Sequence, residues 1–290
     1  MVSATRIESA IESALQAHLS EDCPPRLASA VRYAVIPGGG RIRPRLTLSV
    51  AEACGSDDPG CVDAAAVSVE LLHCASLVHD DMPCFDDADL RRGKPTVHVA
   101  FDERLALLVG DELIVMAFEV LAAGAARHPE RLQALMRVIG RSVGAPRGII
   151  AGQAYECEPG VDLRAYQQAK TGALFSAACA AGATAAGANP EPWYVLGKRL
   201  GEAYQVLDDL RDRYETVEVI GKPVGQDVRH ARPSAVTELG FEGAIARLQS
   251  LVNIAAESVP ACTGRESLMS KINAQGEQAI SRIRALCEAA

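Results

Sequence analysis

One apolar run constrains this chain more than any other feature. It reads "VDAAAVSVELLHCASLVHD" from Val62 to Asp80 and is apolar on nearly every side when wound as an α-helix. A helix that is apolar all round has to be covered by other elements, because it has no face for water. The run therefore predicts a buried helix inside a bundle, with an acidic end at Asp80.

Helical periodicity dominates the rest of the chain as well. Near the N-terminus, apolar residues recur at every fourth position until two prolines interrupt the pattern: Ile7, Ile11, Leu15 and Leu19, then Pro24 and Pro25. Longer helical patterns occupy residues 101–128 and 193–212. We find no convincing alternating strand pattern, repeat or linker, so residues 1–290 are predicted to form a single all-α domain.

Composition narrows the possible partners. The chain holds 37 acidic residues against 29 basic ones, an excess that argues against nucleic acid. Its nine cysteines form no C-x-x-C pair, which suits reduced thiols in the cytoplasm. The N-terminal "MVSATRIESAIESAL" lacks the apolar core of a signal peptide, and "TGALFSAACAAGATAAGA" is too weakly apolar to span a bilayer. We therefore expect a cytoplasmic protein without a transmembrane segment.

The buried helix leads into an acidic cluster, "HDDMPCFDDADLRRGKP". Asp80 and Asp81 lie at the helix end, because Pro83 cannot continue a regular helix. The turn that follows brings Asp86 back toward them. Carboxylates at a helix C-terminus are disfavoured by the helix dipole, so a compensating cation is expected.

A second acidic cluster, "QVLDDLRD", follows the apolar residues of a later helix. Asp208 and Asp212 are four residues apart and therefore project from one helical face, where like charges repel. Two such clusters facing each other across the bundle indicate a shared metal site. Oxygen-only ligands favour Mg²⁺, which commonly bridges carboxylates to substrate phosphates. For either cluster alone, a solvated acidic surface is the competing interpretation.

Basic residues accompany the acidic clusters. Arginine forks match phosphate oxygens, and glycines let the backbone approach an anion. The motifs "GGGRIRP", "RRGKP", "KTGALF" and "GKPVGQD" supply such residues: Arg41, Arg43, Arg91, Arg92, Lys170 and Lys222. Acids for a metal and bases for phosphate, without a Walker-type loop, predict a site for a diphosphate.

Taken in order, these motifs resemble those of the trans-isoprenyl diphosphate synthases, and the resemblance covers nearly the whole chain. "DDMPCFDDADLRRGKP" is similar to the family's first Asp-rich motif in its bacterial form, and "YQVLDDLRD" is similar to its second. "GGGRIRP", "GDEL", "GQAYE", "KTGALF" and "GKPVGQD" fall in the family's order. More narrowly, "LLHCASLVHDDMPCFDDADLRRGKP" and "AGQAYECEPGVDL" resemble geranylgeranyl diphosphate synthases of phototrophic bacteria that make carotenoids and bacteriochlorophyll.

The resemblance implies an isoprenoid synthase helix bundle with a central cavity, assembled as a homodimer. It implies head-to-tail condensation of isopentenyl diphosphate with allylic diphosphates to give geranylgeranyl diphosphate. Mg²⁺, three ions once substrate is bound, would be held by Asp80, Asp86, Asp208 and Asp212. The allylic diphosphate would be bound by Arg91, Lys170 and Lys222, and isopentenyl diphosphate by Arg43, His73 and Arg92. Thr171 and Gln205 would turn their oxygens toward the developing allylic cation.

This chain departs from the family pattern at three positions. The family usually has lysine where Gly40 stands, so the isopentenyl diphosphate pocket lacks one cation, and Arg41 is expected to compensate. Arg232 replaces a second lysine, and Glu156 stands where aspartate is common.

Product length is expected to depend on the helix that leads into the first cluster. Ser76 and Ala75 precede Asp80 by four and five residues, and both are expected near the face that carries Asp80. In the family, an aromatic residue at the Ala75 position marks bacterial farnesyl diphosphate synthases. The small Ala75 therefore favours the longer geranylgeranyl product.

Three alternatives stay open on the sequence. A farnesyl diphosphate synthase would differ only in product length. A class I terpene cyclase would usually pair the first acidic motif with an Asn/Ser/Glu motif, whereas this chain carries a second D-D-x-x-D. A non-catalytic partner subunit of a prenyl synthase would usually lack one acidic cluster, whereas this chain keeps both.

Overall fold

A computed structural model of the chain describes residues 4–36, 38–160, 163–214 and 234–289. Most of these residues are helical and only four are in strands, which confirms the predicted all-α class. In chain order the helices are α1 (Ala4–His18), α2 (Pro25–Val35), α3 (Ile42–Ala53), α4 (Pro59–Asp80), α5 (Val97–Ala100), α6 (Glu103–Gly124), α7 (Pro129–Val143), α8 (Ile149–Ala154), α9 (Leu163–Gln167), α10 (Ala173–Ala185), α11 (Glu191–Tyr214), α14 (Ala235–Glu257) and α15 (Arg265–Ala289). A 3-10 turn, η1 (Tyr155–Cys157), and a π-helical segment, η2 (Gln168–Gly172), lie between α8 and α10.

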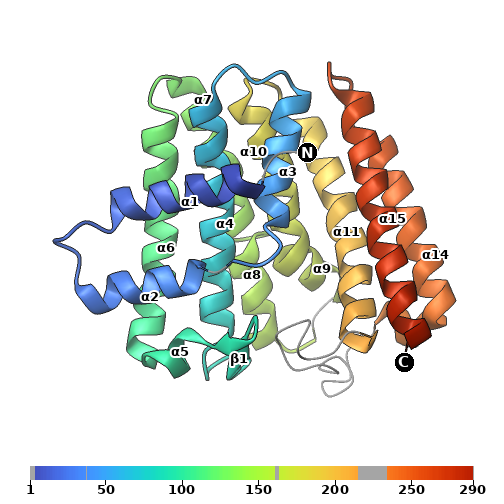
Figure 1. Cartoon of the computed structure of the whole chain (residues 1–290), viewed down its shortest axis with the longest axis horizontal. Coiled ribbons are helices and arrows are strands. Elements are labelled where there is room, and N and C mark those ends of the chain that lie inside the picture. Colours follow the sequence, from blue (N-terminus) through green and yellow to red (C-terminus); the bar gives the residue numbers. More distant parts are fainter. Residues whose placement is uncertain (1–3, 37, 161–162, 215–233, 290) are drawn as a thin grey trace.

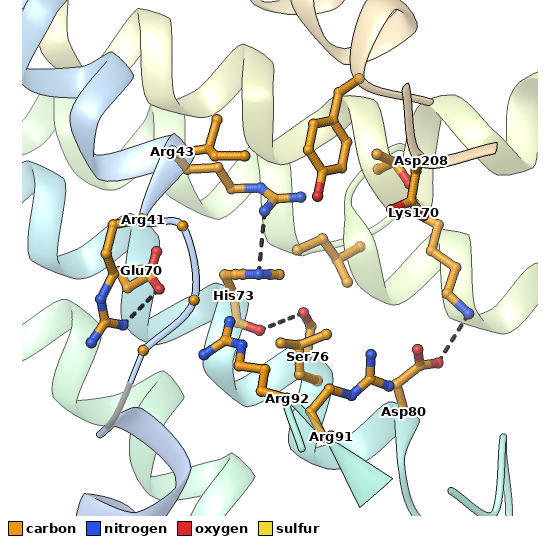
Figure 2. Close-up of a pocket in the computed structure, with 18 of the residues that line it drawn as sticks. Arg41, Arg43, Glu70, His73, Ser76, Asp80, Arg91, Arg92, Lys170 and Asp208 are labelled. Carbon is orange, nitrogen blue, oxygen red and sulfur yellow. Dashed lines mark hydrogen bonds and ion pairs between the residues drawn. The ribbon is translucent and has the colours of Figure 1, made fainter. Parts of the chain in front are cut away.

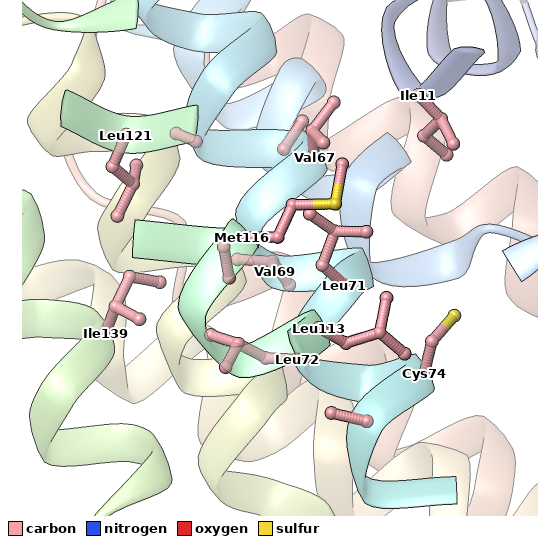
Figure 3. Packing of buried hydrophobic residues seen from close by; sticks show 14 of the residues in the cluster. Ile11, Val67, Val69, Leu71, Leu72, Cys74, Leu113, Met116, Leu121 and Ile139 are labelled. Carbon is pink, nitrogen blue, oxygen red and sulfur yellow. The ribbon is translucent and has the colours of Figure 1, made fainter. Parts of the chain in front are cut away.

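The apolar run of the sequence forms α4, which stands in the middle of the main core (Figure 1). The helix starts after Asp58, whose side chain accepts hydrogen bonds from the N–H groups of Gly60 and Cys61. Its leucines pack against α6, as Figure 3 shows for Leu71, Leu72 and Leu113. Within the described residues, α4 is also the one helix with the length and hydropathy of a membrane span, and 78% of that window is buried inside the protein. Such burial is what a core helix requires.

The N-terminal helices cover one side of this core, where α1 and α2 lie across α4 and α6 (Figure 1). The predicted apolar stripe of α1 is confirmed, since Ile7, Ile11 and Leu15 are buried. Leu19 lies just beyond the end of the helix and packs against the same core.

A second apolar cluster joins α11, α14 and α15, which stand side by side at one end of the molecule (Figure 1). Helices α3 and α10 contribute side chains to both clusters and so connect them. Their contact needs a glycine, because a Cβ at Gly182 would lie 2.3 Å from the carbonyl oxygen of Thr47. One domain over residues 1–290 remains a prediction, since residues 215–233 lie outside the described part.

No strand pattern is visible in the sequence, yet a short hairpin follows the first acidic cluster. Its strands are β1 (Leu90–Arg91) and β2 (Lys94–Pro95), paired antiparallel. The two residues between them, Arg92 and Gly93, have φ values of 54° and 74°. Positive φ at both central positions is the geometry of a type I′ hairpin turn, which fits the twist of paired strands. The hairpin fixes the neighbouring arginines, Arg91 and Arg92, at the edge of the site described next.

Candidate active site

A cavity of about 600 Å³ opens at the acidic end of α4. Its walls come from the segment before α3 and from α3, α4, the hairpin, α8, η2, α11 and α15. The predicted site residues that line it are Arg41, Arg43, His73, Ser76, Asp80, Arg91, Arg92, Lys170, Thr171, Gln205 and Asp208. The structure thus gathers most of the predicted site from segments far apart in the sequence. Lys222 and Arg232 lie outside the described residues.

One side of the cavity is acidic: Asp80 and Asp208 line it, and Asp80 belongs to a carboxylate cluster whose other members, Asp86 and Glu156, are not lining residues. Carboxylate oxygens of Asp80, Asp86 and Glu156 lie within 4.8 Å of one another. Asp80 is the last residue of α4, and the backbone N–H of Asp86 donates to the Asp80 carbonyl oxygen at 3.0 Å, which folds the acidic loop back as predicted. Glu156 comes from η1 and was not predicted as a metal ligand. Its motif, "GQAYE", was the only signal that could have suggested it.

Lys170 bonds to two of these carboxylates, and Figure 2 shows its ammonium group facing Asp80. Its Nζ lies 2.9 Å from Asp80 Oδ1 and 2.7 Å from Glu156 Oε1. Burial lowers the pKa of Lys170, but Asp80 and Glu156 more than offset this, so the pKa is raised and the ammonium group is charged. The π-helical turn of η2 carries both Lys170 and Thr171 into the cavity wall.

The second acidic cluster reaches the same cavity through one residue. Asp208 lines the cavity from α11, whereas Asp212, one turn further, is 9% exposed and is not a lining residue. Asp209 is used structurally, because it accepts hydrogen bonds from the Ala235 N–H at 2.8 Å and from Gln205 Nε2 at 3.0 Å. The bond from Gln205 uses its amide nitrogen and leaves the amide oxygen as the group that a cation could attract.

The opposite side of the cavity is basic (Figure 2). Arg43 Nη1 lies 3.2 Å from His73 Nε2, and its guanidinium stacks over Phe175 at 4.7 Å from the ring centre. Since arginine only donates, His73 Nε2 accepts and the ring proton is on Nδ1. Burial, and then the nearby charge of Arg43, holds the pKa of His73 well below its usual value, so the ring is neutral.

Two guanidinium groups on this side lack a carboxylate partner in the described part of the chain. Arg43 forms no ion pair there, and its Nε is buried without a hydrogen-bond partner. Arg92 forms neither a hydrogen bond nor an ion pair with any described residue, and it lines the cavity beside Gly39. Burial lowers the pKa of Arg43, and the nearby charges of Tyr204, Glu70 and Asp208 offset this only in part. An anion bound in the cavity would supply a counter-charge to both guanidinium groups.

Arg41 does not present its charge to the cavity, contrary to the prediction from the missing cation at Gly40. Its guanidinium is buried and bonded to Glu8 and Glu70 rather than presented to the cavity. It therefore cannot supply the cation missing at Gly40 without leaving the buried carboxylate of Glu70 unpaired, so that expectation is corrected. Arg91 lines the cavity but forms a close ion pair with the buried Asp81.

The two residues that were expected to control product length, Ser76 and Ala75, lie in different surroundings. Ser76 lines the cavity, and its Oγ donates to the His73 carbonyl oxygen at 2.8 Å. Ala75 is 2% exposed, belongs to the main apolar core and does not line the cavity. Four residues return a helix to within about 40° of the starting face, whereas five residues place a side chain about 140° away. The expectation that Ala75 shares the face of Asp80 was therefore wrong.

Comparison with known proteins agrees with this geometry. The sequence pattern of the polyprenyl synthetase family matches residues 24–263, which is most of the chain. The chain belongs to the polyprenyl synthetase family. It is 54% identical to the geranylgeranyl diphosphate synthase of Cereibacter sphaeroides, over 95% of this chain and 96% of that protein. It is 52% identical to the enzyme of the same name from Rhodobacter capsulatus, over 92% of each chain.

Solved structures share the helical bundle. A geranyltransferase from Legionella pneumophila superposes with a TM-score of 0.80 at 27% identity, covering 97% of this chain and 94% of that one. A geranyltransferase from Helicobacter pylori, solved in complex with magnesium and isoprenyl diphosphate, gives 0.79 at 30% identity over 96% of each chain. The predicted isoprenoid synthase fold is confirmed by these likenesses.

Proposed function

We propose that this chain condenses isopentenyl diphosphate with allylic diphosphates, head to tail, to make geranylgeranyl diphosphate. One observation carries the proposal: a single cavity borders a carboxylate cluster on one side, and on the other side it is lined by two guanidinium groups that form no ion pair with a described residue. Such a cavity suits two diphosphate substrates that bind in different ways. One binds through metal to the acids and has to leave, while the other binds directly to arginine and has to stay. The names of the bacterial relatives support the choice of product.

The acidic side fits Mg²⁺, because its donors are carboxylate oxygens only and three of them converge within 4.8 Å. Asp80, Asp86 and Glu156 would hold metal there, with Asp208 contributing from α11. A ligand role for Asp212, which does not line the cavity, and three ions with substrate bound remain predictions. Bound Mg²⁺ would neutralise the allylic diphosphate as it leaves. Lys170 would turn its ammonium group from Asp80 and Glu156 to a phosphate oxygen, since metal and Lys170 share these carboxylates.

The basic side would hold isopentenyl diphosphate. Arg43 and Arg92 carry the charge, and Arg43 is oriented by the neutral His73 and by the ring of Phe175. The allylic cation left after ionisation would face the oxygens of Thr171 and Gln205, which also line the cavity. The isopentenyl double bond then attacks this cation. The proton lost from the adduct would pass to the departing diphosphate, the strongest base in the cavity.

The test is product analysis with purified protein. Isopentenyl diphosphate and Mg²⁺ are supplied with each allylic starter in turn, and the products are separated by chromatography. We expect geranylgeranyl diphosphate as the main product. Farnesyl diphosphate alone would indicate the shorter-chain synthase, and allylic substrate consumed without isopentenyl diphosphate would indicate a terpene cyclase. No turnover, combined with an altered product from a second synthase, would indicate a non-catalytic partner subunit.

We also propose that the chain forms a homodimer. Helix α6 packs one face on α4 but leaves Leu107, Leu108 and Val115 about half exposed on the other. A second copy would cover this face. Light scattering should give the dimer mass, and Leu108→Glu should give the monomer mass. A cytoplasmic location and a role in carotenoid biosynthesis are proposed from the resemblance to phototrophic bacterial enzymes.

A further inference from the structure

Arg41 is a buried charge directly behind the basic side of the cavity. Its side chain is 4% exposed, and four of its five N–H groups are bonded. Nε and Nη2 donate to the two carboxylate oxygens of Glu8 at 2.9 and 3.1 Å. Nη1 donates to Glu70 Oε1 at 2.8 Å, and Nη2 also donates to the carbonyl oxygen of Val35 at 3.0 Å. One guanidinium thus links helix α1, helix α4 and the C-terminal end of helix α2.

The glycine segment of the cavity wall rests on this guanidinium. A Cβ at Gly38 would lie 1.9 Å from Arg41 Cζ, so the backbone there is in direct contact with the arginine fork. On the next residue, a Cβ at Gly39 would lie 3.0 Å from Arg92 Nε. The segment is therefore packed between a structural guanidinium on one side and a cavity guanidinium on the other. Figure 2 shows Arg41 and Glu70 together, away from the cavity centre.

The same contacts fix the start of α3 and the face of α4 that the site uses. Arg41 is the residue before α3 and has a φ of 48°, a left-handed conformation that a non-glycine residue adopts only when its surroundings hold it. Arg43 follows two residues later. Glu70, one turn before His73 on α4, is 2% exposed. The bonds to Arg41 thus relate the helix that carries Arg43 to the helix that carries His73.

The charge of Arg41 is held in place by its partners. Burial lowers its pKa, but the hydrogen bonds that it donates to Glu8 and Glu70 and the negative charge of Glu70 raise it more, and the net pKa is above the usual value. With two glutamates bonded to it, Arg41 adds no uncompensated positive charge to the cavity. Its contribution to the site has to be geometric.

We propose that Arg41 is a positioning residue for isopentenyl diphosphate and that helix α1 takes part in the active site through Glu8. This rests on the proposed function, because it assigns the basic side of the cavity to that substrate. Helix α1 lies outside residues 24–263, the part matched by the family pattern, and none of its residues lines the cavity. Through Glu8 and Arg41 it nevertheless sets the position of the glycine segment and of Arg43.

Helix α1 offers a matched control for this proposal. Glu12 lies one turn after Glu8 and also accepts a hydrogen bond from an arginine, Arg32 Nη1 at 2.6 Å. Arg32 belongs to α2 and does not line the cavity. Glu8→Gln and Glu12→Gln therefore each remove one carboxylate charge from the same helix, but only Glu8→Gln weakens the ion pair and hydrogen bonds that position Arg41.

We expect Glu8→Gln to raise the KM for isopentenyl diphosphate about tenfold, the size of one weakened charge-assisted hydrogen-bonded pair. The KM for the allylic substrate and the melting temperature should stay close to wild type, because the acidic side and the core are untouched. Glu12→Gln should leave both KM values unchanged. Calorimetric titration with isopentenyl diphosphate alone, which cannot react without an allylic partner, should show the same loss of affinity for Glu8→Gln.

Arg41→Lys is the second variant, because lysine keeps the charge but cannot bond two glutamates through a planar fork. It should raise the same KM at least as much as Glu8→Gln. Equal KM values for Glu8→Gln and Glu12→Gln would overturn the proposal. A fall in kcat and melting temperature together with a rise in both KM values would also overturn it, because such general damage indicates a purely structural ion pair. If the wild-type protein neither binds nor consumes isopentenyl diphosphate, the proposed function itself fails.

Discussion

At the residue scale, the surroundings of His73 in the cavity fix its protonation state. Its Nε2 accepts from Arg43, and burial with this neighbouring cation keeps the ring neutral in the folded protein. In the unfolded chain the ring has the usual histidine pKa of 6.5. Below that pH the unfolded chain binds a proton that the folded protein does not, so the stability contributed by neutral His73 is complete above pH 6.5 and is lost as pH falls.

His73→Gln tests this linkage, because a glutamine carbonyl can still accept from Arg43 but does not titrate. The difference in unfolding free energy, wild type minus His73→Gln, should fall between pH 7.5 and pH 5 by up to about 2 kcal/mol. Urea unfolding at a series of pH values measures it. A difference that stays constant with pH would mean that the ring can take up a proton inside the folded cavity.

The separation of Ser76 from Ala75 gives a second prediction at this scale. Ser76→Phe should fill the cavity one turn below Asp80 and shift the main product toward farnesyl diphosphate. Ala75→Phe should instead overpack the core and lower the unfolding free energy by about 1–3 kcal/mol. Chromatography of the products and urea unfolding distinguish the two variants. A shortened product from Ala75→Phe with unchanged stability would show that the growing chain passes on the Ala75 side.

At the scale of elements, glycines decide how closely the helices approach. Gly182 on α10 leaves room for the Thr47 carbonyl of α3, whereas Gly140 on α7 is exposed, and a Cβ added there would meet no atom within 4 Å. This contrast offers a matched pair of identical substitutions. Both positions have helical backbone, so alanine itself is not strained at either.

Gly182→Ala should lower the unfolding free energy by about 1–3 kcal/mol, because α3 and α10 must move apart and both apolar clusters share them. Gly140→Ala should raise it by about 0.5–1 kcal/mol through helix propensity alone. Urea unfolding of both variants measures the difference. Equal effects of the two substitutions would contradict the close contact between α3 and α10.

At the scale of the whole molecule, the site lies where the two apolar clusters meet. Asp80 comes from α4 of the first cluster and Asp208 from α11 of the second. A ligand that contacts both sides of the cavity therefore ties the two halves of the bundle together. The acidic and basic sides should then depend on each other for binding.

Mg²⁺ and inorganic diphosphate together should raise the melting temperature more than the sum of their separate effects. At a hundred times the dissociation constant, a ligand that binds only the folded state adds about 2.7 kcal/mol. Asp80→Asn should remove most of the shift, and Asp22→Asn, an exposed carboxylate outside the cavity, should not. Differential scanning calorimetry measures the effect. A melting temperature indifferent to both ligands would contradict a metal-bridged diphosphate site.

Local patterns along the sequence determined the helical class, the buried α4 and the placement of Asp80 at its end. Each depends on residues within a turn or two: apolar neighbours make the helix buried, and Pro83 stops it. The order of the motifs likewise indicated the family and half of the residues that line the cavity, because each motif carries its own charge and backbone geometry.

Only the tertiary structure decided which charges meet. Glu156 joins Asp80 and Asp86 although η1 is far from α4 in sequence, and Arg41 turns from the cavity because Glu8 and Glu70 hold it. Ion pairing and burial depend on distances between elements, which the period of a single helix does not specify, so sequence patterns could propose these residues but not assign their partners.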